Sequence, residues 1–360
     1  MRRTPALIVG GGPAGAAAAI TLARAGMPHL LVERQRVTGD TLCGGFLSWR
    51  TLQSLAALGI EADAINPSAV TRVRIFAGTR TASADLPMAA RSVSRRRLDT
   101  LLLDRAEALG AAVERGVTVR AVEDNAIRTA DGATIAAEAL FLASGKRDVR
   151  GLARPGTARG ADPTLGIRVR LAPSRSLARA LGHVIELHLF PGGYAGLAMQ
   201  EDGSANLCLA VHDSRFRSAG GAEALLRALG NDHPMLGERL EGADMGASEA
   251  IANVPYGWRE RRGAAGLFRL GDQAGVIPSL AGEGMGIALA SGIAAADAYR
   301  RDGPAAAVDW QVGFARRAHR PIAVAGLVRS ISESAAAPAI LPLLGPWLIK
   351  VIARVTRIAH

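Results

Sequence analysis

A glycine-rich turn near the N-terminus constrains the fold more than any other feature of this sequence. The turn reads Gly10-Gly11-Gly12-Pro13-Ala14-Gly15 and lies between an apolar stretch at residues 6–9 and an alanine-rich stretch at residues 16–25. A second apolar stretch, residues 30–32, ends in Glu33. Strand, glycine turn, helix, second strand and acid in this order are typical of the βαβ unit that binds dinucleotides.

The parts of this unit have separate tasks. Gly10 allows the tight turn, Gly12 lets the backbone approach a pyrophosphate, and Gly15 lets the helix and the strand pack closely. The first N–H groups of the helix and its dipole favour a negatively charged phosphate. Glu33 is expected to accept a hydrogen bond from a ribose hydroxyl. The flanking strand, helix and acid favour this interpretation over an ordinary glycine loop.

The composition limits the kinds of protein that this chain can be. The chain has 360 residues, 49% of them hydrophobic, which is enough for one large or two ordinary domains. The formal net charge is +11, and Lys146 and Lys350 are the only lysines, so arginine carries the excess. This charge favours anionic partners, but scattered arginines and an aromatic content of 4% argue against nucleic acid. Two cysteines exclude a disulfide framework and indicate a reducing, cytoplasmic setting, and no histidine or cysteine spacing indicates a metal site.

The order of predicted elements indicates a nucleotide-binding domain interrupted by a β-rich domain. Alternating apolar residues predict strands within residues 70–88 and four more within residues 165–211. The pattern returns to a strand at residues 266–270 and a helix at residues 284–298. We therefore expect an α/β fold, with a Rossmann-like domain interrupted by an antiparallel sheet and followed by C-terminal helices. The expected boundaries are 1–69, 90–155 and 255–300 for the nucleotide domain, 70–89 and 156–254 for the substrate-binding sheet domain, and 301–360 for the C-terminal helical segment.

A second glycine-rich segment follows the late strand. Gly271-Asp272 ends this strand, and residues 278–286 read Pro-Ser-Leu-Ala-Gly-Glu-Gly-Met-Gly before the next helix. An acid at the carboxyl end of such a strand points into the crevice where α/β folds bind ligands. The simpler alternative is an aspartate that caps a helix beside turn glycines.

Four segments, spread over residues 6–295, together carry a family resemblance. They are Gly10–Gly15 with Glu33, Ser94-Arg95-x-x-Leu98-Asp99, Ala143-Ser144-Gly145, and Gly271-Asp272 with residues 281–286. In these segments the chain resembles the FAD-dependent oxidoreductases of the glutathione-reductase-type superfamily. Within that superfamily it is similar to the branch of monooxygenases, halogenases and geranylgeranyl reductases.

The resemblance implies a role for each segment. Glu33 would hold the adenosine ribose, Arg95 would lie by the pyrophosphate, and the backbone of Val119 would contact adenine. Asp272 would bind a ribityl hydroxyl, and the loop Gly282–Gly286 would lie beside the flavin pyrimidine, where it stabilises the anionic reduced ring. The alternatives are a surface position for Arg95 and a plain strand-core position for Val119. The expected FAD contacts are Gly10, Gly12, Pro13, Ala14, Gly15, Glu33, Arg34, Arg95, Val119, Gly145, Gly271, Asp272, Gly282, Gly284, Met285 and Gly286.

Two family motifs are missing from this sequence, and their absence limits which of the family's reactions we expect. The chain lacks the W-x-W-x-I-P motif of the halogenases and the lysine that they use for catalysis, which argues against halogenation. It also lacks the Asp-Gly pair through which aromatic hydroxylases bind NADPH, and it has residues 144–150, Ser-Gly-Lys-Arg-Asp-Val-Arg, in that place. NAD(P)H is still the expected external reductant, although the sequence does not imply how it binds.

Two loops resemble those of the geranylgeranyl reductases. Residues 40–46, Asp-Thr-Leu-Cys-Gly-Gly-Phe, resemble the loop that these enzymes place near the isoalloxazine, and residues 190–194 resemble the sheet edge that frames their substrate cavity. The alternatives are a cysteine that only packs in a tight loop and aromatic residues that only fill the sheet core. The resemblance implies candidate catalytic positions Cys43, Gly282 and Gly284, and candidate substrate contacts Phe190, Tyr194 and Pro278.

The C-terminal end is apolar but interrupted. Three prolines and Lys350 break the apolar run within residues 335–360, which argues against a membrane-spanning helix. From Trp347 onward one helical face is apolar, whereas Lys350, Arg354 and Arg357 share another face. Such a helix lies either on an anionic membrane surface, at the inner membrane face, or against the protein's own substrate domain.

Three functional hypotheses follow. The first is an FAD-dependent monooxygenase of secondary metabolism that acts through a flavin C4a-hydroperoxide on an apolar, polyketide- or isoprenoid-like substrate, free or carrier-bound. The second is a flavin-dependent ene reductase of geranylgeranyl-reductase type, which transfers a hydride to a prenyl double bond. The third is a non-catalytic flavin-binding protein. For all three we expect a cytoplasmic location, with peripheral membrane contact through residues 347–360 as an addition.

Overall fold

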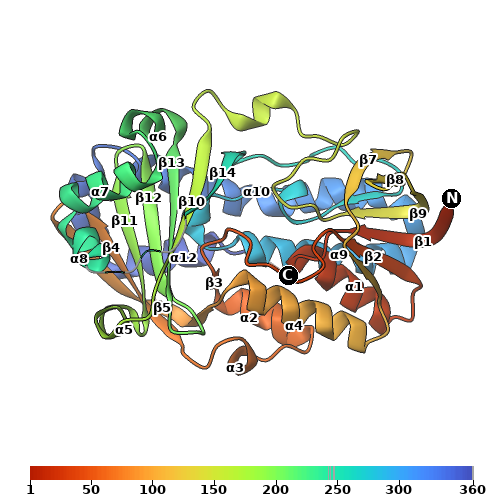
Figure 1. Ribbon diagram of the computed structural model, residues 1–360, viewed down its shortest axis with the longest axis horizontal. Helices are drawn as coiled ribbons and strands as arrows, with labels where there is room; N and C mark the ends of the chain where they lie inside the picture. Colours follow the sequence, from red (N-terminus) through yellow and green to blue (C-terminus); the bar gives the residue numbers. More distant parts are fainter. Residues whose placement is uncertain (242, 244, 246–247, 359–360) are drawn as a thin grey trace.

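The structure, a computed structural model, describes residues 1–241, 243, 245 and 248–358, and these form two β-sheets (Figure 1). The first sheet has seven strands in the order β6-β2-β1-β9-β8-β7, with β15 paired to β9. The second has eight strands in the order β14-β10-β13-β12-β11-β4-β5-β3. The α/β architecture expected from the sequence is confirmed.

The strands of the first sheet are β1 (Arg2–Val9), β2 (His29–Glu33), β6 (Ala112–Arg115), β7 (Val119–Glu123), β8 (Ala126–Thr129), β9 (Thr134–Leu142) and β15 (Leu267–Arg269). The strands of the second sheet are β3 (Phe46–Leu47), β4 (Val70–Ala77), β5 (Arg80–Ser92), β10 (Thr164–Leu171), β11 (Val184–Phe190), β12 (Gly193–Met199), β13 (Ala205–His212) and β14 (Glu249–Val254). The α-helices are α1 (Pro13–Arg24), α2 (Trp49–Ala57), α3 (Ala62–Ile65), α4 (Arg95–Ala108), α5 (Arg175–Leu181), α6 (Asp213–Ala219), α7 (Ala222–Asp232), α8 (Pro234–Leu240), α9 (Gly284–Asp302), α10 (Ala307–Ser332), α11 (Ala337–Ile340) and α12 (Pro346–Val355). Short 3₁₀ turns are η1 (Gly156–Arg159), η2 (Gly271–Gln273), η3 (Ser279–Ala281), η4 (Gly303–Ala306) and η5 (Leu341–Leu343).

The centre of the first sheet is parallel. Residues 6–9 of β1 are buried, as expected for a strand that is covered on both faces. β1 pairs in parallel with β2 and β9. Residues 267–269 of β15 pair in parallel with residues 140–142 at the end of β9. Because parallel strands end at the same edge, this pairing brings the segment after β15 next to the glycine turn after β1.

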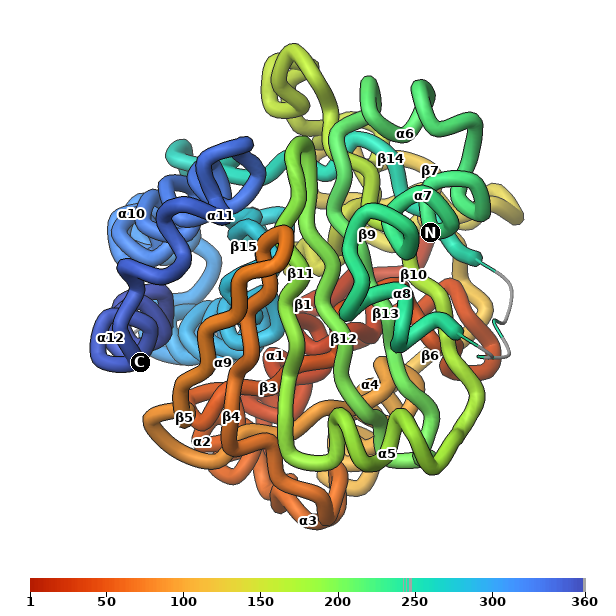
Figure 2. Tube along the Cα trace, turned by 90° about the vertical axis from the view of Figure 1, so that its left-hand side faces the viewer, coloured from red at the N-terminus to blue at the C-terminus, as the bar shows by residue number. Residues whose placement is uncertain are grey.

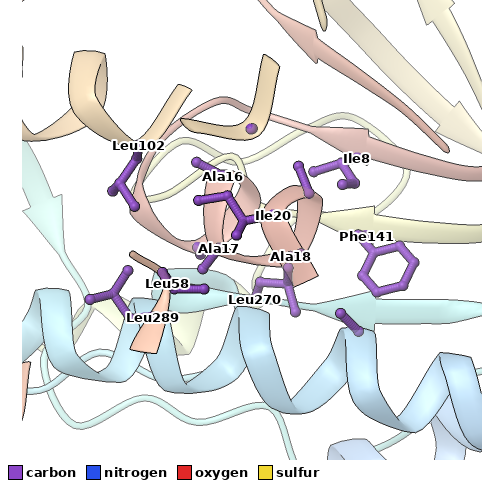
Figure 3. Close-up of a cluster of buried hydrophobic side chains, with 14 of the residues drawn as sticks. Ile8, Ala16, Ala17, Ala18, Ile20, Leu58, Leu102, Phe141, Leu270 and Leu289 are labelled. Atoms are coloured by element: carbon purple, nitrogen blue, oxygen red, sulfur yellow. The ribbon is translucent and has the colours of Figure 1, made fainter. Parts of the chain in front are cut away.

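Small residues let two helices cross closely in the core (Figure 3). Ala16, Ala17 and Ala18 of α1 are completely buried, and α1 packs on α9. At Gly292 of α9 a Cβ atom would lie 2.2 Å from the carbonyl oxygen of Ala14, which is too close for any side chain. The alanine-rich composition of α1 is therefore a requirement of packing as well as of helix formation.

The second sheet is antiparallel except for the parallel pair β4–β11. It takes its strands from residues 70–92 and 164–254 and adds β3 from residues 46–47. Helices α5 to α8 cover the outer face, where Leu225 and Leu229 pack with sheet residues (Figure 1). The domain boundaries themselves remain a prediction.

The C-terminal helices lie along the edge of the second sheet (Figure 2). Helix α12 packs on β5, and η5 contacts the same strand. Within the described part of the chain, no single helix has the length and apolar content to cross a membrane, although the bent pair Gly284–Ser332 and Ala337–Leu343 meets that test jointly by length and composition.

Candidate cofactor and substrate site

One cavity of about 700 Å³ is lined by residues of both sheets and of the C-terminal helices. It contacts the glycine turn at residues 10–14, the loop at residues 41–46, and the segments at residues 143–149 and 270–272. It continues to residues 279–285. The fold therefore gathers segments far apart in the sequence, including all four that carry the family resemblance, around a single space.

The glycine turn is fixed by close backbone packing. Gly10 has φ +106°, and a Cβ there would lie 2.5 Å from the carbonyl oxygen of Ala143. Glu33 accepts hydrogen bonds from the N–H of Gly11 at 2.7 Å and of Gln35 at 2.8 Å. Gly12, the N-cap of α1, has no side chain that could cap the helix, so the start of α1 is open to a phosphate.

Gly15 packs beneath the turn and does not line the cavity. A Cβ at Gly15 would lie 1.9 Å from the carbonyl oxygen of Gly10. This is the close-packing role that the fingerprint assigns to its third glycine. Direct contact of Gly15 with the cofactor, which we had expected, is thus replaced by support of the turn.

Arg95 lies against the glycine turn, and its side chain is only 15% exposed. Its guanidinium forms two hydrogen bonds with Asp99, at 2.9 and 2.6 Å. A Cβ at Gly12 would lie 3.2 Å from Arg95 Nη2. The surface alternative for Arg95 is therefore wrong, because the arginine presents its charge to the cavity beside the start of α1. Val119 also lines the cavity, together with Thr118.

Asp272 lies where β15 ends and faces a cation that our sequence analysis did not place in the site. Lys146 Nζ lies 3.2 Å from Asp272 Oδ2, and this neighbour raises the pKa of Lys146. The N–H of Gly271 donates to Ser291 Oγ at 2.8 Å, which fixes the turn. Lys146 follows the strand end at Ser144-Gly145 and is one of only two lysines, a signal that could have identified it.

The loop before α9 is held by a buried carboxylate. Gly282 has φ +62°, and a Cβ there would lie 2.7 Å from the ring of Phe46. Glu283 is completely buried and accepts from Ser48 Oγ at 3.0 Å and from Arg357 at 2.8 Å. Glu283 is the N-cap of α9, but its side chain makes no capping hydrogen bond to the first N–H groups of the helix, so these groups are not capped by this side chain.

Gly286 has a packing role as well. A Cβ there would lie 2.5 Å from Glu283 Oε1, and Gly286 does not line the cavity. Gly282, Gly284 and Met285 do line it. The predicted contact at Gly286 is therefore replaced by support of the Glu283 carboxylate.

Of the three predicted substrate residues, Tyr194 lines the cavity, whereas Phe190 and Pro278 do not. Ile185, Leu187 and Leu189 of β11 line the cavity, and side chains alternate along a strand, so Phe190 lies on the opposite face. Phe190 is 1% exposed in the cluster under the outer helices. Pro278 is buried but is not part of the cavity wall, whereas Tyr194 is.

Both cysteines line the cavity. The carbonyl oxygen of Cys43 accepts from Asn206 Nδ2 at 3.0 Å, which ties the loop to β13. Cys208 lies on the same strand, two residues after Asn206. Burial raises the pKa of the Cys208 thiol to about 12, so this thiol stays protonated at neutral pH.

The C-terminal helix corrects one part of our amphipathic assignment. Ile349, Ile352 and Ala353 of α12 line the cavity, whereas Trp347 is 74% exposed. Arg357, which we had placed on the basic outer face, is 8% exposed and bonds to Glu283 and to the carbonyl oxygen of Ala281. The helix ends at Val355, so the helical periodicity does not extend to Arg357.

Tyr194, Tyr256 and Tyr299 are the three tyrosines of the chain, and burial raises the pKa of each. For Tyr256 the pKa is raised to about 12. A raised pKa means that the unfolded chain releases these protons at lower pH than the folded protein does. The contribution of these tyrosines to the free energy of unfolding is therefore fully present below pH 10 and is lost as the pH rises above it. An ultraviolet titration should show no tyrosine ionisation near pH 10 in the folded protein and three ionising groups after denaturation; a step near pH 10 in the folded protein would contradict these positions.

Comparison with known proteins agrees with this geometry. Residues 3–150 match the family model described as an FAD binding domain. Digeranylgeranylglycerophospholipid reductase 2 of Methanopyrus kandleri is 26% identical over 79% of this chain and 74% of its own length. Menaquinone reductase of Mycobacterium tuberculosis is 28% identical over 94% of this chain and 86% of its own length. The chain is an FAD-dependent oxidoreductase.

The fold has relatives among solved structures too. A flavoprotein/dehydrogenase from Cytophaga hutchinsonii has a TM-score of 0.78 at 18% identity, with 94% of this chain and 88% of that chain covered. At this identity the likeness concerns the fold. It agrees with a Rossmann-like FAD domain joined to a second sheet.

The residues around the cavity fit FAD. The starts of α1 and α9, which no side chain caps, both border it, and Arg95 and Lys146 also line it. A long dianionic cofactor needs this arrangement, with positive ends for the pyrophosphate and for the reduced ring. When bound, FAD supplies two-electron chemistry, which the protein positions and shields from water.

Proposed function

We propose that this oxidoreductase reduces a carbon–carbon double bond of a long, apolar, isoprenoid-like molecule. The main support for this proposal is that one part of the cavity wall is lined by aliphatic side chains. This part is formed by side chains of β4, β5, β11 and the C-terminal segment: Val73, Ile75, Leu86, Ile185, Leu187, Leu189, Leu341, Leu344, Ile349 and Ile352. Burial of an apolar chain against such a wall yields about 0.8 kcal/mol per methylene group.

Each group of residues has a defined task in this proposal. Gly10–Ala14 and Arg95 would hold the pyrophosphate, and Asp272 with Lys146 would hold the ribityl chain. The Gly282–Met285 loop at the start of α9 would stabilise negative charge on the reduced ring. The aliphatic wall would orient the alkene and exclude water. Cys43 and Gly282 line the same space and would contact the reacting groups.

The two relatives from Methanopyrus kandleri and Mycobacterium tuberculosis support reduction over oxygenation, since both are named as reductases and one is named for a digeranylgeranyl lipid. Monooxygenation of an apolar substrate, our first hypothesis from the sequence, is the alternative. NAD(P)H as the external reductant is part of the proposal in both cases. Membrane contact through residues 347–360 is a further proposal, supported by the exposed side chain of Trp347.

Anaerobic single turnover tests the proposal. The FAD-loaded protein is reduced with dithionite and mixed with geranylgeraniol in detergent, and the flavin absorbance is followed. We expect reoxidation of the flavin and a product heavier by two hydrogens. Phytanol, which has no double bond, is the matched control and should leave the flavin reduced.

Oxygen separates the two reactions. A flavin that stays reduced without oxygen, together with a product that gains an oxygen atom in air, would reject reduction and favour monooxygenation. Repeating the experiment with NADPH in place of dithionite tests the reductant. Flavin reduction by NADPH within the turnover time is the expected result.

A further inference from the structure

Three hydroxyl groups meet in the wall of the cavity. Tyr194 OH and Ser279 Oγ lie 2.7 Å apart, and Tyr256 OH donates to the same Ser279 Oγ at 2.7 Å. The N–H of Leu280 donates to Tyr194 OH at 3.0 Å. Tyr194, Ser279 and Tyr256 all line the cavity. We call these three side chains the hydroxyl cluster.

The cluster has one hydroxyl hydrogen more than its internal bonds use. Two hydrogen bonds join three hydroxyls, and Tyr256 is the donor in one of them. The remaining hydrogen is therefore on Ser279, when Tyr194 donates to it, or on Tyr194, when Ser279 donates. Among the described residues, no further acceptor bonds to this hydrogen. It is available to a molecule in the cavity.

A positive charge faces the cluster from α10. The guanidinium of Arg329 lies over the Tyr256 ring, 4.8 Å from its centre. Arg329 is held in place by Glu333 at 2.6 Å and by Thr164 Oγ1 at 2.7 Å. Burial raises the pKa of Tyr194 and Tyr256, whereas Arg329 lowers both. The phenols are thus neutral at rest, and the phenolate that remains after proton loss is stabilised by a nearby cation.

We infer that Tyr194 is the proton donor to the substrate and that Ser279 and Tyr256 are positioning residues that support it. A phenol is a stronger acid than the alcohol of Ser279. After it loses its proton, Tyr194 keeps two hydrogen-bond donors, Ser279 Oγ–H and the N–H of Leu280. The inference rests on the proposed alkene reduction, which requires a proton for one of the two carbons.

The O–H bond of Tyr194 breaks, the π bond of the alkene breaks, and a C–H bond forms between the tyrosine proton and one carbon. The other carbon receives a hydride, that is, the electron pair and hydrogen supplied by the reduced flavin. The tyrosinate regains its proton from solvent through Tyr256 and Ser279.

The main test compares two identical substitutions. Tyr194→Phe removes the donor, and Tyr299→Phe, at a 4% exposed tyrosine packed on Phe141 away from the cavity, is the matched control. In anaerobic single turnover with geranylgeraniol, Y194F should slow flavin reoxidation by about 100-fold, the scale of general acid catalysis, and Y299F should not.

Product stereochemistry separates proton donation from a structural role. In D₂O the wild-type protein should place deuterium on one face of the carbon that Tyr194 protonates. Y194F should place deuterium on both faces of that carbon. Unchanged rates and stereochemistry in Y194F, with active wild type, would overturn the inference and leave the proposed reduction standing. No reoxidation by wild-type protein would instead reject the proposed function and the inference with it.

A readout without turnover tests the cluster itself. Ser279→Ala removes the hydroxyl that would stabilise either phenolate, so the ultraviolet titration of the apoprotein should show tyrosine ionisation beginning at higher pH. The FAD content and visible spectrum of S279A should match those of wild type. A titration curve that superimposes on the wild-type curve would contradict the hydrogen-bonded cluster.

Discussion

Replacing Gly15 by alanine is expected to weaken FAD binding more than any other single methyl group added to this protein. The new Cβ would lie 1.9 Å from the carbonyl oxygen of Gly10, a backbone atom that cannot rotate away. Overpacking of this kind costs about 1–3 kcal/mol, and 3 kcal/mol lost from binding corresponds to about a 100-fold weaker affinity. Because Gly10 and Gly12 line the cavity, movement of the turn changes the pyrophosphate site directly. Fluorescence titration of the apoprotein with FAD measures the effect.

Gly313→Ala is the matched control. Gly313 is also inside a helix, α10, but a Cβ there would meet no atom within 4 Å. Alanine is favoured over glycine in a helix interior, so this substitution should stabilise the protein by about 0.5–1 kcal/mol and leave FAD affinity unchanged. Equal FAD affinity in G15A and G313A would show that the tight packing under the turn is not needed for the cofactor.

The glycine turn was predictable because its residues act locally. Gly10 and Gly15 are needed for the backbone path itself, and Glu33 follows within the same βαβ unit. The late Gly271-Asp272 turn could be connected with it because parallel strands end at one edge of a sheet. These relations depend on residue type and order, which a sequence displays.

The substrate side was less predictable, because a strand pattern does not say which face meets which neighbour. Both faces of β11 carry apolar side chains, since helices cover the face with Phe190 and the cavity borders the face with Leu187. The strand pattern therefore predicts the wrong face for Phe190, while Ile185 and Leu187 line the cavity. Lys146 was overlooked for a related reason, as its partner Asp272 lies 126 residues later.

The position of Arg357 in the C-terminal segment was also not predictable from the sequence. A helical projection placed Arg357 with Lys350 and Arg354, but α12 ends at Val355 and Arg357 turns inward. Its partner Glu283 lies 74 residues earlier in the chain. No local pattern indicates such a pairing, which depends on how the last residues return to the loop before α9.

Arg357→Met is expected to be strongly destabilising. The substitution leaves the completely buried carboxylate of Glu283 without its cation, and breaking a buried ion pair in this way costs about 3–5 kcal/mol. It also removes the hydrogen bond to Ala281 and the contact of the guanidinium with Trp49, 5.2 Å from the ring centre. Chemical denaturation measures the loss, and the visible spectrum of bound FAD should shift because the Gly282 loop is loosened.

Two further variants separate charge burial from a general weakness of the C-terminal segment. Arg354→Met removes an exposed arginine of α12 and should change the free energy of unfolding by less than about 0.5 kcal/mol. The double variant Glu283→Gln, Arg357→Met removes the uncompensated charge, so it should recover a large part of the stability that R357M loses. If the double variant is as unstable as R357M, the arginine acts through packing on Trp49 and the Ala281 carbonyl, and the carboxylate is not what the arginine stabilises.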